Sequence, residues 1–273
     1  MKNWLNNEYV IITGASSGIG KELCRIFTKK YNAKVIGVAR NEQRLQALQQ
    51  EIGDSFTYYP MDVTEKENWY ALRVYLEFQE IQPVLIINNA GAFPPFANGL
   101  DLTSETYENT MKINYYPSVY CVELLTATMK KAGKYLPYIV NVSSSAGLCP
   151  VVGTTAYTAS KFALKGYTQA LALDTKGKLH VGTVFPGTTA TELFSGDIQT
   201  HNSALDKIAM PVQKMAKKIA RKIRKRKRYM VMGWDAKLMN FASKIMPVKG
   251  PGFIRWVMKV SKSKVFKNVF KDE

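Results

Sequence analysis

Tyr157 and Lys161 stand four residues apart, and Ser144 lies 13 residues before Tyr157. Residues at this spacing share one face of a helix, so the phenol and the ammonium can act together. Transfer of a hydride to a carbonyl carbon leaves an alkoxide, which needs a proton and a hydrogen bond. A neighbouring ammonium favours the phenolate, so we expect Lys161 to lower the pKa of Tyr157 from its ordinary value of about 10. Chance alone predicts such a Tyr–Lys pair in a chain of this composition, so its weight comes from the motifs that accompany it. In their company, Tyr157 would be the acid/base and Ser144 would hydrogen-bond the substrate oxygen.

A glycine-rich turn follows the apolar run at residues 10–12 and opens a helical pattern. Glycine lets the backbone turn tightly and approach a pyrophosphate, and the first amides of a helix attract negative charge. Glycine-rich turns are common, so it is the strand before and the helix after that favour dinucleotide binding. The residues expected at the dinucleotide are Gly14, Ser16, Ser17, Gly18, Ile19 and Gly20.

Arg40 stands 20 residues beyond Gly20, at the end of the second apolar run. A carboxylate at this place would bind a ribose 2′-hydroxyl. A guanidinium suits a 2′-phosphate instead, through paired charge-assisted hydrogen bonds. The sequence thus favours NADPH over NADH. The alternative is that Arg40 is a solvated charge before the next helix.

The elements that position these residues alternate along the chain. Short apolar runs typical of buried strands lie at residues 10–12, 35–38, 56–59, 84–87, 139–142, 181–184 and 229–232. Helical patterns separate them, as in βαβ units, and one of these covers 155–172. We therefore predict an α/β fold: a doubly wound, Rossmann-type parallel sheet of about seven strands with helices on both faces. Residues 1–233 form a single domain in this prediction, and 234–273 a basic amphipathic extension.

The ordered set of motifs resembles the short-chain dehydrogenase/reductase family over about residues 8–192. These motifs are residues 13–20, Asp62-Val63, Asn88-Asn89-Ala90-Gly91, Asn114, Ser144, Tyr157 to Lys161, and Pro186-Gly187 with Thr191. The resemblance implies an oxidoreductase with a nicotinamide cofactor and the catalytic residues Asn114, Ser144, Tyr157 and Lys161. In this set, Asn114 would position a proton-relaying water, and Lys161 would also hold the nicotinamide ribose.

The resemblance also implies further cofactor contacts. The residues are Asp62 and Val63 at the adenine, Asn89, Ala90 and Gly91 at the adenosine ribose, and Pro186, Gly187, Thr189 and Thr191 at the nicotinamide. Three scattered cysteines form no disulfide framework or zinc pattern, so no metal site is expected.

Residues 92–101, 148–155 and 190–205 would shape the substrate pocket in such a fold. They include Phe93, Phe96 and Phe194 and contain no cluster of charges that would bind a small acid or a phosphate. We expect a hydrophobic ketone or alcohol as substrate, such as a lipid, a 3-oxo acyl chain or a steroid-like molecule. Two alternatives are a 3-oxoacyl thioester reductase that docks an acidic carrier protein and a non-catalytic nicotinamide-binding regulator or scaffold.

The net charge of +17 comes from the C-terminal quarter of the chain. Residues 1–206 carry 18 basic and 18 acidic side chains, whereas residues 207–273 carry 20 and 3. The pattern over 211–228 predicts an amphipathic helix with a cationic face. Further on, Trp234, Leu238, Phe241, Ala242 and Ile245 form one predicted apolar stripe, and residues 252–270 mix aromatic side chains with lysines.

Several partners suit these basic helices. They can lie on an anionic membrane, pack across the active-site mouth or contact a second subunit in a homodimer. Nucleic acid is disfavoured because no recognition motif accompanies the charge. The chain has no run of 18 apolar residues and no N-terminal signal pattern. We therefore expect a cytoplasmic protein, peripheral on a membrane if the basic helices bind one.

Overall fold

The computed structural model describes residues 3–190, 209–260 and 269. A parallel sheet forms its centre, built from β1 (Tyr9–Thr13), β2 (Lys34–Ala39), β3 (Phe56–Pro60), β4 (Pro83–Asn88), β5 (Tyr138–Val142), β6 (His180–Pro186) and β9 (Tyr229–Met232). The spatial order of these seven strands is β3-β2-β1-β4-β5-β6-β9. Each of the seven apolar runs in the sequence lies within one of them, so the predicted fold class is confirmed.

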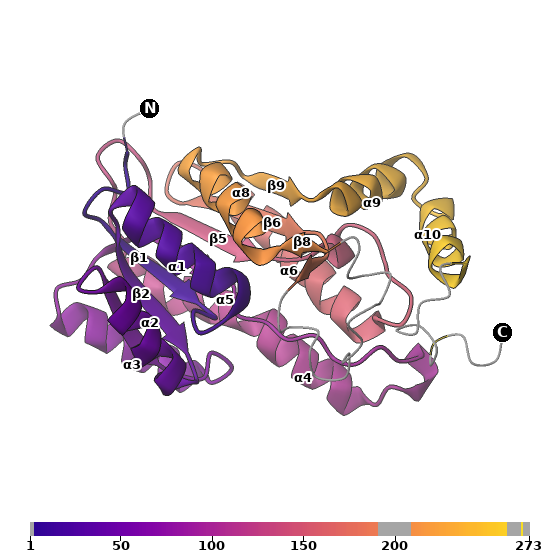
Figure 1. Ribbon diagram of the computed structural model, residues 1–273, viewed down its shortest axis with the longest axis horizontal. Coiled ribbons are helices and arrows are strands. Elements are labelled where there is room, and N and C mark those ends of the chain that lie inside the picture. Colours follow the sequence, from indigo (N-terminus) through magenta and orange to yellow (C-terminus); the bar gives the residue numbers. More distant parts are fainter. Residues whose placement is uncertain (1–2, 191–208, 261–268, 270–273) are drawn as a thin grey trace.

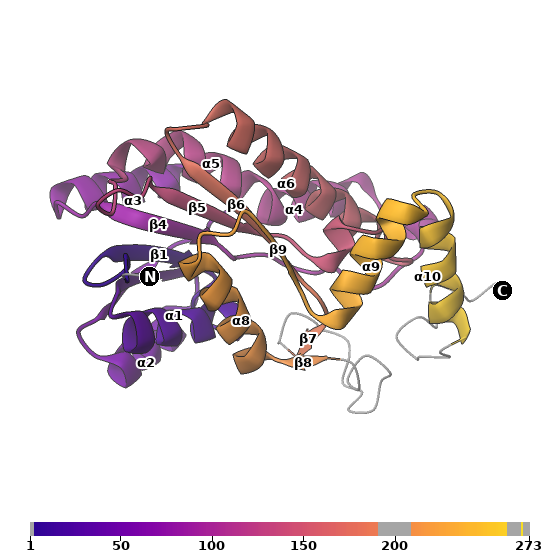
Figure 2. The ribbon, with the colours of Figure 1, turned by 90° about the horizontal axis from the view of Figure 1, so that it is seen from above.

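Helices cover both faces of the sheet, and the two layers are separated most clearly in Figure 2. One layer contains α1 (Gly18–Tyr31), α2 (Glu42–Ile52) and α8 (Val212–Arg224). The other contains α3 (Lys66–Phe78), α4 (Ser104–Asn114), α5 (Tyr116–Leu125) and α6 (Thr155–Asp174). The remaining helices α9 (Trp234–Ile245) and α10 (Lys249–Val260) lie at the end of the molecule toward which β9 points (Figure 1).

Short elements complete the chain. They are the 3-10 turns η1 (Gly99–Asp101), η2 (Thr126–Thr128) and η3 (Ser145–Gly147), and the strands β7 (Thr189–Ala190) and β8 (Met210–Pro211). Strands β7 and β8 pair with each other in a separate two-stranded sheet. Among the described helices, none is long and apolar enough to span a bilayer.

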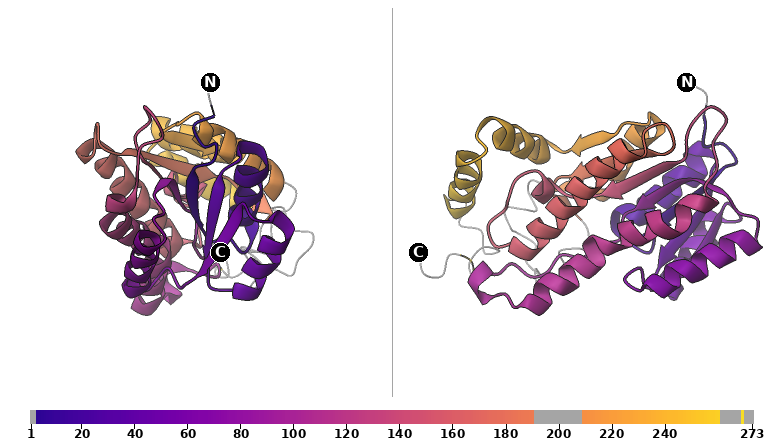
Figure 3. Two further views of the ribbon diagram at one scale, coloured as in Figure 1. Left: turned by 90° about the vertical axis from the view of Figure 1, so that its left-hand side faces the viewer. Right: turned by 180° about the vertical axis from the view of Figure 1, so that it is seen from behind.

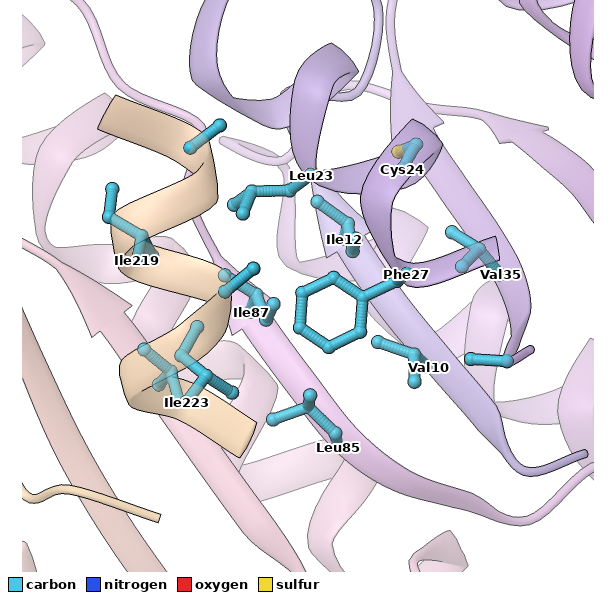
Figure 4. Packing of buried hydrophobic residues seen from close by; sticks show 14 of the residues in the cluster. Val10, Ile12, Leu23, Cys24, Phe27, Val35, Leu85, Ile87, Ile219 and Ile223 are labelled. Carbon is cyan, nitrogen blue, oxygen red and sulfur yellow. The ribbon is translucent and has the colours of Figure 1, made fainter. Parts of the chain in front are cut away.

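The core beneath α1 and α8 explains why α8 is amphipathic. Phe27 of α1 is buried among side chains of β1, β4 and α8, including Ile12 and Ile219 (Figure 4). The apolar side chains of α8 are buried in this core except for the half-buried Val212, and its lysines are exposed. Burial of large apolar side chains stabilises a fold by about 1.5–3 kcal/mol each. The cationic helix predicted at 211–228 is therefore a structural helix of the main layer.

Helix α9 differs from the prediction of one apolar stripe. Trp234, Phe241 and Ile245 are exposed, whereas Ala242 is buried with Met239 on the opposite side. Successive residues of a helix are about 100° apart, so Phe241 and Ala242 fall on different faces. The prediction was wrong in joining them, and α9 has two apolar faces. Of residues 261–270, only position 269 lies within the described part of the chain.

Candidate active site

The turns that follow β1 and β4 are tied together at the carboxyl edge of the sheet. The Thr13 hydroxyl accepts hydrogen bonds from the backbone N–H groups of Asn89 and Ala90, each at 3.0 Å. The Asn89 side chain donates to the Thr13 carbonyl, also at 3.0 Å. Thr13 is buried, so this link is shielded from water. The arrangement fixes the glycine-rich turn relative to the Asn89-Ala90-Gly91 loop.

The glycine-rich turn forms a close backbone cradle at the start of α1. Gly14 and Gly18 have φ values of +67° and +53°, which residues other than glycine rarely adopt. A Cβ atom at Gly20 would lie 2.1 Å from the carbonyl oxygen of Gly14. Ser17 is the N-cap of α1, yet its side chain makes no capping hydrogen bond. The first amides of α1 can therefore bind another acceptor. The turn places all six predicted residues together: Gly14, Ser16, Ser17, Gly18, Ile19 and Gly20.

Arg40 and Asp62 follow the neighbouring strands β2 and β3. The Arg40 guanidinium is 3.7 Å from the Asp62 carboxylate and is 76% exposed. Burial opposes ionisation of Asp62, but hydrogen bonds from Thr64 and the charge of Arg40 bring its pKa below the ordinary value. Val63 is buried in the core. Asn41 caps α2 through the Arg44 N–H, so Arg40 precedes that helix and extends into solvent at the sheet edge.

Helix α6 brings Tyr157 and Lys161 to the carboxyl edge of β5. Their exposed fractions are 5% and 4%. The Lys161 ammonium lies 5.4 Å from the centroid of the Tyr157 ring and donates to the carbonyl of Val142 at 3.4 Å. Ser144 hydrogen-bonds the Tyr157 phenol, and its hydroxyl also accepts from the Ala146 N–H at 3.2 Å. The serine, the phenol and the amine thus meet at one place.

Burial is the main cause of the pKa shifts of Tyr157 and Lys161. It raises the pKa of Tyr157 to about 12, although the hydrogen bond from Ser144 opposes the shift. It also lowers the pKa of Lys161 to about 8. The sequence led us to expect a lowered phenol pKa, and this prediction is wrong. Removal of both groups from water disfavours both charged forms, and this outweighs their mutual attraction.

Asn114 is the last residue of α4, and both its side-chain oxygen and its side-chain nitrogen form hydrogen bonds. Its Oδ1 accepts from the Ala92 N–H at 3.0 Å, and its Nδ2 donates to the Ala92 carbonyl at 2.9 Å and to Ser160 at 3.2 Å. A Cβ atom at Gly91 would lie 2.8 Å from the Asn114 Oδ1 and 3.3 Å from the Lys161 Nζ. Helices α4 and α6 run beside each other (Figure 3). Gly91 therefore lies close to both the Asn114 amide and the Lys161 ammonium.

The break between α4 and α5 leaves the backbone carbonyl of Asn114 without its helical hydrogen bond. Helix α5 begins at Tyr116 with Pro117 in its first turn. The Ser118 N–H donates to the carbonyl of Tyr115 at 3.1 Å instead of that of Asn114. The Asn114 carbonyl has thus lost the partner that a continuous helix would provide.

The loop after β6 is held by a residue that sequence reasoning missed. The Gly187 N–H donates to the Met232 carbonyl at 2.7 Å, and the Thr189 hydroxyl donates to the Gly187 carbonyl at 2.9 Å. The Asp235 carboxylate accepts from the Thr188 N–H. Asp235 is the only acidic residue in 207–271, a signal that could have singled it out. Pro186 ends β6 next to this loop, and Thr191 lies outside the described residues.

A buried polar chain also joins the sheet to α6. The Asn88 amide donates to Asn141 at 2.9 Å, and the Asn141 amide donates to Thr168 of α6 at 2.9 Å. Ser143 adds a hydrogen bond to the Lys161 carbonyl at 3.1 Å. Asn141 interrupts an apolar strand, which was the available signal for this chain. These bonds fix the position of α6 relative to β4 and β5.

Aromatic and aliphatic side chains border the phenol. The Phe93 ring centroid is 4.6 Å from that of Tyr157 and 4.9 Å from that of Phe96. Cys149 is fully buried with Met239 of α9 and Ile254 of α10. The C-terminal helices thus cover the segment that follows η3. Of the third predicted pocket segment, 190–205, only Ala190 is described.

Comparison with known proteins decides the family. The family model for short chain dehydrogenases matches residues 8–202. The chain belongs to the short-chain dehydrogenase family. The resemblance noted in the sequence is confirmed, and so is the prediction of an oxidoreductase at the level of this family.

Named relatives match most of this chain. The 3-ketodihydrosphingosine reductase of Bos taurus is 34% identical over 204 residues, which cover 72% of this chain and 60% of that protein. The 3beta-hydroxysteroid dehydrogenase 2 of Eggerthella lenta is 30% identical over 200 residues, covering 70% of this chain and 75% of that protein. The match thus spans less than two thirds of the bovine reductase.

A solved structure supports the fold. The closed form of serine dehydrogenase complexed with NADP+ has a TM-score of 0.71 and 23% identity to this chain. The alignment covers 82% of this chain and 94% of that one. At this identity, the match concerns the architecture of the sheet and its helices.

Proposed function

We propose that this short-chain dehydrogenase reduces a hydrophobic, lipid-like ketone to the corresponding alcohol with NADPH. The observation that carries the proposal is the meeting of Ser144, Tyr157 and Lys161 beside the backbone cradle of α1. An acid, a hydrogen-bond donor and a dinucleotide cradle are the parts that carbonyl reduction requires.

The cradle residues fit a dinucleotide. The close approach of Gly20 to Gly14 makes the turn tight, and the uncapped start of α1 offers N–H donors to a pyrophosphate. The exposed guanidinium of Arg40 at the end of β2 suits the 2′-phosphate that distinguishes NADPH from NADH. Asp62, Val63, Asn89, Ala90 and Gly91 would hold the adenosine, and Pro186, Gly187, Thr189 and Thr191 the nicotinamide.

The residues of the chain divide the proton chemistry among themselves. Bound NADPH would supply the hydride to the carbonyl carbon. Tyr157 donates its proton to the carbonyl oxygen, and Ser144 holds that oxygen by a hydrogen bond. Lys161 stabilises the phenolate that remains and binds the nicotinamide ribose. A water bound to the unpaired Asn114 carbonyl returns a proton to the phenolate. The main chain of Asn114 thus serves the proton relay, while its side chain holds Ala92 by hydrogen bonds.

The protonation states favour reduction. A phenol whose pKa is raised to about 12 is protonated at neutral pH and is therefore a ready donor. An amine whose pKa is lowered to about 8 still carries its charge at pH 7. Both groups thus begin in the state that proton donation to a carbonyl needs.

The surroundings of the phenol support an apolar substrate. Residues 92–101 and 148–155 contain one charged side chain, the exposed Asp101, and the Phe93 ring lies against that of Tyr157. The names of two relatives, a 3-ketodihydrosphingosine reductase and a 3beta-hydroxysteroid dehydrogenase, point to the same class of molecule. We therefore propose a long-chain or steroid-like ketone.

Cofactor consumption tests this function. The purified protein is incubated with NADPH or NADH and a panel of ketones: a 3-oxo sphingoid base, a 3-oxosteroid and a 3-oxoacyl carrier-protein thioester. We expect NADPH oxidation with the first or second ketone and an alcohol product two mass units heavier. Preference for the carrier-protein thioester would favour the thioester reductase. Binding of NADPH without oxidation by any ketone would favour the non-catalytic regulator.

A further inference from the structure

Helices α9 and α10 each present a second apolar face to solvent. Their inner faces pack around Cys149, through Met239 of α9 and Ile254 of α10. On α9, the opposite face carries Trp234, Phe241 and Ile245, which are 59%, 60% and 61% exposed. We call the exposed apolar set the outer face: Trp234, Leu238, Phe241, Ile245, Met246, Val248, Phe253, Trp256 and Val260. Large apolar side chains exposed on two helices that contact each other are typical of an interaction surface.

Positive charge accompanies the outer face. Its helices and their connection carry Lys237, Lys244, Lys249, Arg255 and Lys259, all with exposed side chains. Asp235 is the one acidic residue in 234–260, and it is already engaged by the Thr188 N–H. Within residues 234–260, large aromatic side chains and cations therefore occur together, with Asp235 as the single acidic residue.

We propose that the outer face of α9 and α10 docks on the interface of an anionic lipid bilayer. Aromatic rings are favoured at the boundary between head groups and acyl chains, and neighbouring lysines meet the negative lipids. A second copy of this chain is the less suitable occupant. A symmetric contact would bring two sets of the same five cations together, and like charges at an interface are repelled.

The position of the outer face gives docking a consequence for the site. Helix α9 begins at Trp234, directly after β9, and its Asp235 holds the loop after β6. The inner faces cover Cys149, which follows η3 and Ser144. Docking through the opposite faces would hold this end of the molecule against the membrane (Figures 1 and 2). The proposal does not depend on catalysis, and its test uses no substrate.

Vesicle flotation of the full chain tests the proposal. Vesicles of phosphatidylcholine alone are compared with vesicles that contain 30% phosphatidylglycerol. We expect the protein to float with the anionic vesicles and to be released by high salt. Failure of the wild-type chain to float with anionic vesicles at low salt would overturn the proposal.

Tryptophan fluorescence locates the contact on the surface. Trp4 and Trp69 are buried, whereas Trp234 and Trp256 belong to the outer face. Addition of anionic vesicles should shift the emission to the blue, and lipids brominated on the acyl chain should quench it. The double variant Trp234→Phe/Trp256→Phe should lose both changes. Unchanged quenching in that variant would place the contact elsewhere and contradict the proposal.

Matched variants distinguish binding through the outer face from non-specific adsorption to vesicles. Phe241→Asp/Trp256→Asp should abolish flotation, whereas Phe78→Asp, at an 81% exposed aromatic residue of α3, should leave it unchanged. The neutralised variant Lys237→Gln/Lys244→Gln/Lys249→Gln retains the apolar set and should bind about 100-fold more weakly. Wild-type flotation by either outer-face variant, at unchanged circular dichroism, would refute the proposal. Light scattering could instead show that the wild-type chain is a dimer and that the non-floating Asp variant is a monomer. The outer face would then be a contact between two copies of the chain, and the proposal would be refuted.

Discussion

The active-site edge buries polar side chains, whereas the outer face of α9 and α10 exposes apolar ones. At the edge of the sheet, Lys161 and Asn114 are charged or polar and almost fully buried. On the outer face, Trp234 and Phe241 are large and apolar and mostly exposed. Neither arrangement is favourable by itself, because buried charge and exposed apolar surface both cost free energy. Each is held in place by well-packed neighbours.

The proposed chemistry and the proposed docking thus lie on separate elements of the chain. Hydrogen bonds to Val142 and Ala92 support the buried polar groups. The small cluster around Cys149 supports the exposed helices from their other side. A change on one surface should therefore affect its own property and leave the other intact.

Replacement of Lys161 by methionine should lower kcat for ketone reduction by about 1000-fold. The variant retains the length of the side chain but removes the ammonium that stabilises the phenolate. Flotation with anionic vesicles should not change. Lys165→Met, one turn further along α6, is the matched control and should retain activity within about twofold. A Lys161 variant of wild-type activity would remove the ammonium from the mechanism.

Replacement of Arg40 by glutamate should reverse the cofactor preference. Loss of charge-assisted bonds to a 2′-phosphate and a new repulsion should weaken NADPH binding by roughly 100-fold. NADH binding should change little, as measured by fluorescence titration. Arg44→Glu within α2 serves as the control. Equal losses for both nucleotides would show that Arg40 does not select the 2′-phosphate and is only a solvated charge.

The two faces of α9 should respond differently to truncation. Met239→Ala removes a buried side chain and should lower the free energy of unfolding by about 2 kcal/mol. Leu238→Ala, on the outer face, should change it by less than about 0.5 kcal/mol while weakening vesicle binding. Urea denaturation measures the first quantity and flotation the second. Equal destabilisation by both variants would contradict the assignment of two faces.

The pH dependence of reduction should follow Lys161. The folded-state pKa of this amine lies near 8, so its charge is present below that pH and is lost above it. The phenol of Tyr157 stays protonated to much higher pH. We expect kcat/KM for reduction to fall about tenfold per pH unit above pH 8. A profile that stays flat to pH 10 would show that the ammonium is not required.

Local patterns predicted most of the fold and the set of site residues. The seven apolar runs fit parallel strands buried on both faces, and the spacing of Tyr157 and Lys161 fits one helix face. The pKa direction of Tyr157 could not be predicted in this way, because it depends on burial produced by several distant elements. Asp235 and the inner face of α9 were missed for the same reason. Their partners, Thr188 and Cys149, lie far away in the sequence.

The most direct test of the central claim is single-turnover oxidation of NADPH by a ketone in the Tyr157→Phe variant. Tyr167→Phe, ten residues further along α6 at a half-buried tyrosine, is the control. We expect a rate at least about 1000-fold below wild type for Tyr157→Phe, with NADPH affinity unchanged and the control unaffected. A Tyr157→Phe rate within tenfold of wild type would contradict the role of this phenol as the proton donor.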